Sequence, residues 1–371
     1  MPQNEKFWNP YRWVQVSDQP IQQATPNYHH QLSGLSGRIW CELEALTPLI
    51  IGDGQGNFVR RKTDNKPYIP GTSLKGAIRS LAELVGNAAV PFARSDVDAL
   101  HSADQAAQGQ GTNWRLDVVA RMFGYLEGRN AFAGIVRFGD ALVESGTLQS
   151  GASTIFKVAG GQPDPDHRPF YPDRKRRKFY HHQPEAAGLT PPHGGIREDQ
   201  KRPVKPLPPG TTFTFTVDFL NLRDDELNLL LYCLVLEDEV SVTLSRQALD
   251  PDALAPVTIT GPMRHKLGGC KPQGAGSSHI RVTKFTLRSD PTARYRGPSA
   301  DSAIEGSALH EELLRRTQVF RIRTDPTMQE LRAMLIYAAD DPRGKNVNYP
   351  TYAWFQAEKS VAAKTPLKPT V

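Results

Sequence analysis

The stretch "NKPYIPGTSLKGAIRS", residues 65–80, joins a rigid Pro/Gly passage to a basic segment. Beyond this passage, apolar residues recur at the spacing of one helix face: Leu74, Ala77, Ile78, Leu81, Leu84 and Val85. We expect Thr72 or Ser73 to cap the helix start, because a hydroxyl oxygen can accept a hydrogen bond from the free N–H groups there. Lys75 and Arg79 lie four residues apart and project from one side. The stretch therefore predicts a helix with an apolar stripe and a cationic side.

Strands with alternating apolar residues surround this helix in the sequence. The pattern occurs at residues 37–49, 134–145, 211–221 and 279–287, and a nearly all-apolar helix is predicted at 224–237. The order of elements is therefore strand, helix, strand, strand, helix, strand. This is the order of the split βαβ or ferredoxin-like fold, which RNA-recognition domains also use. We predict an α+β protein with a ferredoxin-like, RNA-recognition-type palm.

Long segments interrupt and extend the predicted palm. Residues 87–114 have the composition of a surface insertion, a helix is predicted at 116–126, and residues 160–210 are rich in Pro, Gly, His and basic residues and are predicted as loop. A short strand at 256–260 and helices at 307–316 and 327–338 follow. We divide the chain into three parts: an arm (1–36) that orders on contact, a palm (37–290) with thumb and finger insertions at about 87–132 and 160–210, and a C-terminal extension (291–371) that packs on the palm or on a neighbouring subunit.

The composition is that of a globular, moderately basic protein. Its 371 residues are 39% hydrophobic, enough to bury a core, and carry a formal charge of +6 with a pI near 9.1. A cationic excess favours a polyanionic partner. The cysteines, Cys41, Cys233 and Cys270, are odd in number and far apart, so we predict no disulfide framework. We find no signal-peptide pattern and no apolar run of membrane-spanning length, and we expect a cytoplasmic protein.

The segment "LGGCKPQGAGSSHI", residues 267–280, is a glycine-rich loop before the last strand. Closely spaced glycines let main-chain N–H groups approach a phosphate, and a nearby lysine supplies charge. The segment lacks the GK[ST] ending of a P-loop, so no nucleotide cofactor is predicted. A flexible turn with an incidental lysine is the alternative. Contacts to nucleic-acid phosphates are expected from Lys266, Gly269, Lys271, Gly274 and Gly276.

A second basic segment lies inside the long middle insertion. Cations interleaved with aromatic residues favour nucleic acid, because the cations release counterions from phosphates and the rings stack on bases. A disordered basic loop is the alternative. The predicted RNA contacts here are Arg174, Lys175, Arg176, Arg177, Lys178, Phe179 and Tyr180. The histidines of this region, His167, His181, His182 and His193, match no zinc-ligand spacing, so we predict no zinc site.

Three motifs occur in one order: "PYIPGTSLKGAIRS" at 67–80, "FGYLEGRNAFAGIVRFGDA" at 123–141 and "GGCKPQGAGSS" at 268–278. This order resembles the RAMP superfamily, the RNA-binding proteins of class 1 CRISPR systems. More narrowly, it is similar to the backbone subunits (the Cas seven family) of type III and type III-derived effector complexes. The phrases "NPYRWV", "LSGLSGRI" and "RKFYHHQP" look like a RAMP subgroup found near type III-D loci. The resemblance covers most of residues 9–285.

The resemblance implies a palm whose copies stack into a filament along CRISPR RNA and present its guide to complementary target RNA. An insertion in such subunits forms a thumb that presses between guide and target. The implied partners are CRISPR RNA, target RNA, other copies of the chain, a cap subunit and a separate effector nuclease. Contacts to the sugar-phosphate backbone are expected around the opening helix, from Arg60, Arg61, Lys62, Ser73, Lys75 and Arg79.

Several relatives in that family cleave target RNA with a loop aspartate and a divalent ion. In this chain the loop before the opening helix offers Asp53 and Asp64, and a carboxylate there could hold Mg²⁺ beside a scissile phosphate. Neither position matches the family pattern well, because the loop is short, Asp53 follows the strand directly and Asp64 lies in a predicted turn. We therefore expect a binding subunit without strong nuclease activity of its own.

Three alternatives stay open at the level of sequence. The same scaffold could be a Mg²⁺-dependent endoribonuclease acting through Asp53 or Asp64. A stand-alone ribonuclease that processes CRISPR transcripts would need a general acid or base, for which His29, His30, His181 and His182 are available. A basic globular protein with no RNA ligand is the third alternative, and it predicts no salt-sensitive RNA binding.

Overall fold

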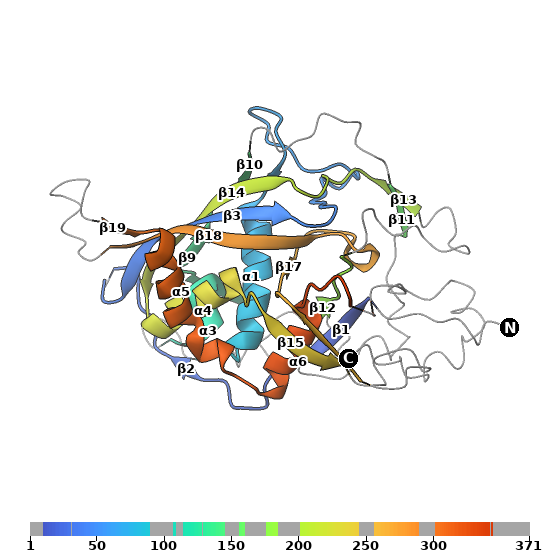
Figure 1. Cartoon of the computed structure of the whole chain (residues 1–371). Coiled ribbons are helices and arrows are strands. Elements are labelled where there is room, and N and C mark those ends of the chain that lie inside the picture. Colours follow the sequence, from blue (N-terminus) through green and yellow to red (C-terminus); the bar gives the residue numbers. More distant parts are fainter. Residues whose placement is uncertain are drawn as a thin grey trace.

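The computed structural model describes residues 10–30, 32–89, 107–108, 114–127, 129–144, 156–159, 176–184, 201–244, 256–288, 301–341 and 343. Within these residues the protein is a mixed α/β structure in which helices lie beneath a long curved sheet (Figure 1). Among the described helices, none combines the length and the apolar character that a membrane crossing requires.

An antiparallel sheet of eight strands forms the centre of the described structure. Its three long strands are β3 (Leu35–Ala45), β14 (Thr212–Leu222) and β18 (Ser277–Arg288), with β3 in the middle. The shorter strands β9 (Val136–Phe138) and β10 (Ala141–Val143) pair with β14, and β4 (Tyr68–Ile69) pairs with β10. On the other side, β17 (His265–Lys266) and β19 (Asp301–Ile304) pair with β18.

The period-two alternation explains why this sheet buries one face. Ile39 pairs with Val217 on one side and with Phe285 on the other, and all three side chains are buried. The predictions of strands at 37–49, 211–221 and 279–287 are confirmed. The single strand predicted at 134–145 is instead two short strands, β9 and β10, which Gly139 and Asp140 separate.

The helices cover the buried face of the sheet (Figure 1). They are α1 (Gly71–Val85), α3 (Val118–Phe123), α4 (Asp224–Val235), α5 (Gly306–Arg321) and α6 (Pro326–Leu335). The predicted apolar stripe of α1 is confirmed, because its Leu74, Ile78 and Leu81 are buried. The helix predicted at 116–126 is too long: the chain leaves α3 at Gly124, whose φ of +97° does not continue a helix, and enters a strand.

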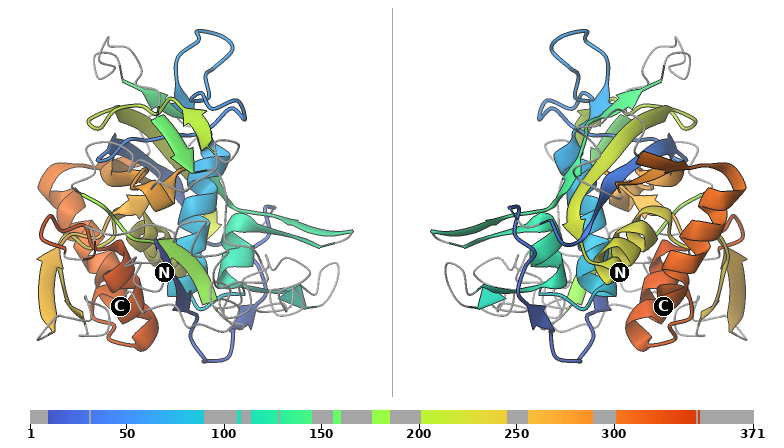
Figure 2. Two further views of the ribbon diagram at one scale, coloured as in Figure 1. Left: turned by 90° about the vertical axis from the view of Figure 1, so that its right-hand side faces the viewer. Right: turned by 90° about the vertical axis from the view of Figure 1, so that its left-hand side faces the viewer.

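Five smaller sheets surround this core in the described part of the chain. They are β1 (Tyr11–Gln15) with β12 (Arg176–Tyr180); β2 (Gln23–Ala24) and β5 (Ala107–Gln108) with β6 (Arg115–Asp117); β7 (Gly124–Glu127) with β8 (Asn130–Ala133); β11 (Phe156–Ala159) with β13 (Lys201–Val204); and β15 (Val240–Leu244) with β16 (Val257–Gly261). The β7–β8 hairpin extends away from the helices (Figure 2). The prediction of loop throughout 160–210 is wrong where β12 and β13 form.

The N-terminal strand β1 holds β12 against the helices. Tyr11 pairs with Tyr180 and Trp13 with Lys178 in an antiparallel ladder. The Arg12 guanidinium forms an ion pair with Glu330 of α6 at 2.7 Å. The two strands and α6 therefore form one unit, in which residues from both ends and the middle of the sequence meet.

The start of α1 is stabilised by a side chain from outside the helix. The expectation that Thr72 or Ser73 caps it is wrong, since the N-cap residue is Pro70 and no capping hydrogen bond comes from its side chain. Instead, Asp140 Oδ1 accepts a hydrogen bond from Gly71 N at 2.8 Å. The residues between β9 and β10 therefore fix where α1 begins.

Replacement of Asp140 by alanine should lower the free energy of unfolding by about 1 kcal/mol, because an N–H group at the helix start loses its acceptor. Urea unfolding of the full chain, followed by circular dichroism, measures this loss. Asp140→Asn keeps an oxygen acceptor and is the matched control, so an equal loss in both variants would contradict the capping role.

Candidate nucleic-acid interface

The first flank of α1 carries the two cations predicted from spacing. Arg79 is engaged within the protein: its Nε donates to Glu83 Oε1 at 3.0 Å and its Nη1 to Gly124 O at 3.2 Å. Lys75 has no carboxylate partner in the described part of the chain. Burial is the main cause that lowers the pKa of Lys75, and the charges of Arg79 and Arg137 add to the effect. Of these two side chains, Lys75 is therefore the one available to a phosphate.

The outward ridge of α1 is open at Gly76. This residue is exposed in the middle of a helix, and a Cβ added to it would meet nothing within 4 Å. Glycine in a helix interior costs about 1 kcal/mol of stability relative to alanine. Because a Cβ would fit at position 76, packing within the described part of the chain does not require glycine there. Thr72, one turn earlier, is also exposed. A bare ridge of this kind lets another chain approach the helix backbone closely.

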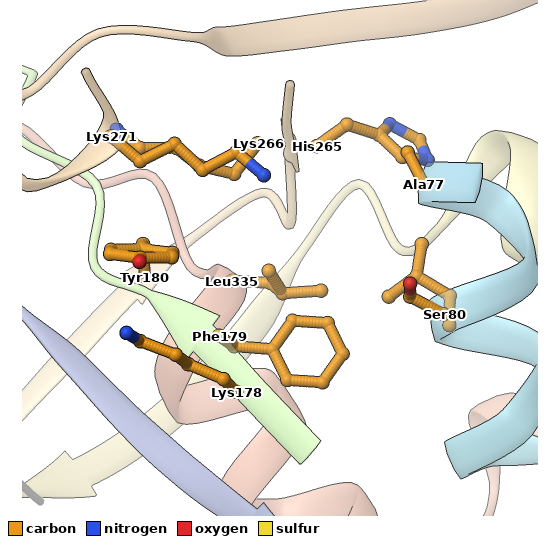
Figure 3. Close-up of a pocket in the computed structure, with 10 residues that line it drawn as sticks. Ala77, Ser80, Lys178, Phe179, Tyr180, His265, Lys266, Lys271 and Leu335 are labelled. Carbon is orange, nitrogen blue, oxygen red and sulfur yellow. The ribbon is translucent and has the colours of Figure 1, made fainter. Parts of the chain in front are cut away.

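The second flank of α1 borders a pocket in which three lysines meet, and we call it the lysine pocket (Figure 3). Lys178 comes from β12, Lys266 from β17, and Lys271 from the short helix η6 (Lys271–Gln273). The cavity has a volume of about 80 Å³. Its lining consists of Ala77, Ser80 and Leu81 of α1, Lys178, Phe179 and Tyr180 of β12, His265 and Lys266 of β17, Lys271, and Leu335 of α6.

Aromatic rings position two of the three ammonium groups. The Tyr180 ring lies between Lys178 and Lys271, whose Nζ atoms are 5.1 and 5.8 Å from the ring centroid (Figure 3). Lys178 Nζ also lies 3.6 Å from the centroid of the Tyr11 ring. Such cation–π contacts stabilise a cation without neutralising its charge.

The three lysines lie in surroundings that disfavour their charged forms. Burial lowers the pKa of Lys266 to about 7 and the pKa of Lys178 to about 8, and in each case the charge of Lys271 adds to the effect. Burial and the charge of Arg177 lower the pKa of Lys271 to about 8. No carboxylate in the described part of the chain pairs with any of the three. The lysine pocket is therefore a site where three lysines gather without a carboxylate partner of their own.

An ion pair links the two walls of the lysine pocket. Arg177 of β12 contacts Glu83 of α1, with Nη1 and Oε2 2.7 Å apart, and its Nη2 donates to Ser80 Oγ at 2.6 Å. The Glu83 side chain is fully buried. Because a buried carboxylate needs its partners, this contact fixes β12, and with it Lys178 and Tyr180, beside α1.

The glycine-rich loop contributes the side chain of Lys271 to the pocket, and its glycine N–H groups are engaged within the protein. Gly276 has a φ of +86°, and a Cβ there would lie 1.9 Å from Leu267 O, so glycine is required for backbone packing inside the protein. The three N–H groups expected to meet a phosphate already have acceptors: Gly269 N donates to Ile50 O at 2.9 Å, Gly274 N to Lys271 O at 3.1 Å and Gly276 N to Pro48 O at 2.9 Å.

Both loop aspartates are used within their own loop. Asp53 Oδ1 accepts a hydrogen bond from Gln55 N at 2.7 Å, which lowers the pKa of Asp53. Asp64 forms an ion pair with Arg61, whose hydrogen bond lowers the pKa of Asp64. The neighbouring Arg60 donates to Asn65 O at 2.8 Å, whereas Lys62 is exposed. Among the described residues, no three His, Cys, Asp or Glu side chains gather as a metal site would require.

The histidines considered for acid–base chemistry differ in how they are bound. His182 Nε2 lies 3.0 Å from Arg264 O and therefore carries a proton, while its Nδ1 accepts from Ser277 Oγ at 2.8 Å. His181 is also buried, and burial lowers the pKa of both rings well below the ordinary value. His29 Nε2 forms a hydrogen bond with Ala133 O, and His30 stacks on Tyr28. Neither histidine lines the lysine pocket. The predicted residues Arg174, Lys175, His167 and His193 lie outside the described residues.

The central part of the chain matches a known protein family. The family model of the RAMP superfamily matches residues 42–237, which is more than half of the 371 residues. The chain belongs to the RAMP superfamily. No curated protein matches it. Membership in the RAMP superfamily implies a CRISPR-associated role in RNA binding and a place in a Cas complex that holds CRISPR RNA. The matched range contains α1 and β12 of this RAMP protein, whereas Lys266 and Lys271 lie beyond it.

The aromatic residues of the N-terminal strand were not predicted as site residues from the sequence. Tyr11 and Trp13 face Lys178, at 3.6 and 6.0 Å from its Nζ atom. Their period-two spacing in "YRWVQ" was the available signal for a strand. Arg137, beside Lys75 in this RAMP protein, was the other residue missed.

Substitution of Gly276 by alanine should destabilise the protein by more than 3 kcal/mol, roughly the sum of a left-handed backbone penalty and steric overlap with Leu267 O. Gly210→Ala is the matched control, because Gly210 also has a positive φ, +81°, but its Cβ would meet nothing within 4 Å. Thermal unfolding of both variants measures the difference. Equal destabilisation would contradict the backbone-packing role of Gly276.

Proposed function

We propose that this RAMP protein is a backbone subunit that binds CRISPR RNA in a type III or type III-derived effector complex. Copies of the chain line up along the RNA and present its guide for pairing with target RNA. The palm is ferredoxin-like in this proposal. Supporting it are the spatial order β18, β3, β14 and then β9 with β10, and the helices α1 and α4 that follow β3 and β14 in the sequence.

The observation that carries the proposal is the arrangement of unpaired cations around α1. Lys75 lies on one flank, the lysine pocket on the other, and the exposed ridge at Gly76 separates them. Lysines without carboxylate partners are suited to phosphates, which fix the position of a nucleic acid without reading its sequence. A guide strand of any sequence can bind in this way, as a CRISPR RNA subunit requires.

Binding, rather than cleavage by this subunit, is the activity that we assign. The Asp53 and Asp64 carboxylates both accept hydrogen bonds from their own loop, and Asp64 also pairs with Arg61. A separate effector nuclease is the partner that would cut the target, and a cap subunit would end the filament. The type III-D subtype is part of the same proposal and rests on the phrases "NPYRWV", "LSGLSGRI" and "RKFYHHQP".

Purification of the full chain from cells that express its CRISPR array tests this function. We expect repeat–spacer RNA to dominate the sequenced co-purifying RNA, and nuclease treatment to leave fragments of regular length where copies protect it. A matched preparation from cells that lack the array is the control. Recovery of mixed cellular RNA with no enrichment of repeat–spacer sequences would contradict the proposal.

Lys75→Met should weaken RNA binding for all sequences alike, because a phosphate contact is lost. The slope of log K against log salt should fall by about 1. Fluorescence anisotropy with labelled CRISPR RNA at several salt concentrations measures both quantities. Lys205→Met, at an exposed lysine that does not line the pocket, is the charge-matched control. If the two variants lose affinity equally, Lys75 makes no specific phosphate contact.

A further inference from the structure

The buried member of the lysine pocket is held in one orientation by a chain of hydrogen bonds. Lys266 Nζ donates to Gly274 O at 3.2 Å and to Ser277 Oγ at 3.1 Å. The Ser277 hydroxyl donates in turn to His182 Nδ1 at 2.8 Å, because the proton of His182 is on Nε2 and bonds to Arg264 O. The serine oxygen is therefore left to accept from Lys266. This network fixes the ammonium at the wall of the cavity.

Lys266 has one more donor than the protein uses. An ammonium carries three N–H donors, and within the described residues two of them have acceptors. Lys266 is only 9% exposed, so water cannot solvate its ammonium freely. A buried charge without a partner lowers the stability of the folded protein. An anionic ligand that pairs with the charge removes this cost.

The neighbours of Lys266 point to an anion as that ligand. The cavity of about 80 Å³ has room for a phosphate group, and α1 and α6 contribute only Ala77, Ser80, Leu81 and Leu335 to it, which carry no charge. The titratable and charged groups around it come from five elements and the residues after β12. They are Glu83 from α1, Tyr11 from β1, Arg177, Lys178 and Tyr180 from β12, Lys271 from η6, His265 from β17, and His181 and His182 after β12. Glu83 is the carboxylate among these groups, and its charge is paired with Arg79 and Arg177, so it does not oppose an anion in the cavity.

We propose that the lysine pocket is a site for a single phosphate group, bound between Lys178, Lys266 and Lys271. The phosphate comes from one of three sources: a backbone diester of bound RNA, a terminal phosphate of RNA, or free phosphate. The first two sources rest on the proposed RNA-binding function, and the site itself does not. The third N–H of Lys266 donates to the anion, and Lys178 and Lys271 neutralise it from the two faces of Tyr180.

Proton uptake accompanies binding at this site. In the empty pocket the lysines have pKa values of about 7 to 8, below the ordinary lysine value. A bound anion favours their charged forms and therefore raises these pKa values. Affinity is then greatest well below pH 7, where all three lysines are protonated without the ligand, and it falls as the pH rises through 7 and 8. His182 and His265 stay neutral throughout, because burial holds their pKa values far below this range.

Sulfate is the probe that tests the site, because its charge is constant across this pH range. Any change of sulfate affinity with pH then comes from titration of groups on the protein. Isothermal titration of the full chain should give saturable sulfate binding that is about tenfold weaker at pH 8.5 than at pH 6.5. Lys266→Met and Lys271→Met should each abolish this binding, while Lys205→Met leaves it unchanged. The second variant keeps the test decisive if the first does not fold.

Competition identifies the source of the phosphate. Displacement of sulfate by RNA with a 5′-hydroxyl indicates a backbone diester, displacement only by 5′-phosphorylated RNA indicates a terminal phosphate, and displacement only by inorganic phosphate indicates the free anion. Absence of saturable sulfate binding, or equal binding by the wild type and both pocket variants, overturns the inference. RNA binding that survives in those variants would leave the proposed function standing, whereas sulfate binding without any CRISPR RNA binding would reject the proposed function alone.

Discussion

The arrangement of the candidate site depends on the buried carboxylate of Glu83. It is fully buried on α1 and is bound by Arg79 of the same helix and by Arg177 of β12. Loss of either arginine would leave a charge in the interior without a full set of partners, which typically costs several kcal/mol. The cationic strand β12 is therefore held against α1 by the same contact that immobilises Arg79. Lys75 and the three lysines of the lysine pocket are among the cations near α1 that have no carboxylate partner in the described part of the chain.

The structure brings like charges together and must hold them there. Burial is the main cause of the lowered pKa values of Lys178, Lys266 and Lys271. The charge of Lys271 adds to the effect on Lys178 and Lys266, and the charge of Arg177 adds to the effect on Lys271. Three features oppose the repulsion among these charges: the Tyr11 and Tyr180 rings, the pairing of β1 with β12, and the glycine-rich loop packed on residues 48–50. An apolar cluster in the same place would not need these three features. Such a local cost in stability is common where a protein holds a binding site in place for its ligand.

The sequence predicted the elements with strong periodicity and missed what depends on tertiary contact. The strands around Ile39, Val217 and Phe285 and the stripe of α1 followed from spacing alone. The cap of α1 did not, because Asp140 is 69 residues from Gly71 in the chain. Motifs identified Lys75, Lys178, Lys266 and Lys271 as candidates, but only the fold shows that the last three line one pocket and that Lys75 does not. Which arginines are already bound to carboxylates is likewise a property of packing.

In the proposed complex, one RNA strand follows α1, between Lys75 and the lysine pocket. The most direct measurement is a cryo-electron microscopy structure of the full chain assembled on CRISPR RNA. We expect consecutive phosphates over the Gly76 ridge, with one of them inside the lysine pocket in contact with Lys266. RNA bound instead on the opposite face of the sheet, where Trp40 lies between Arg38 and Lys284, with the lysine pocket empty, would contradict it.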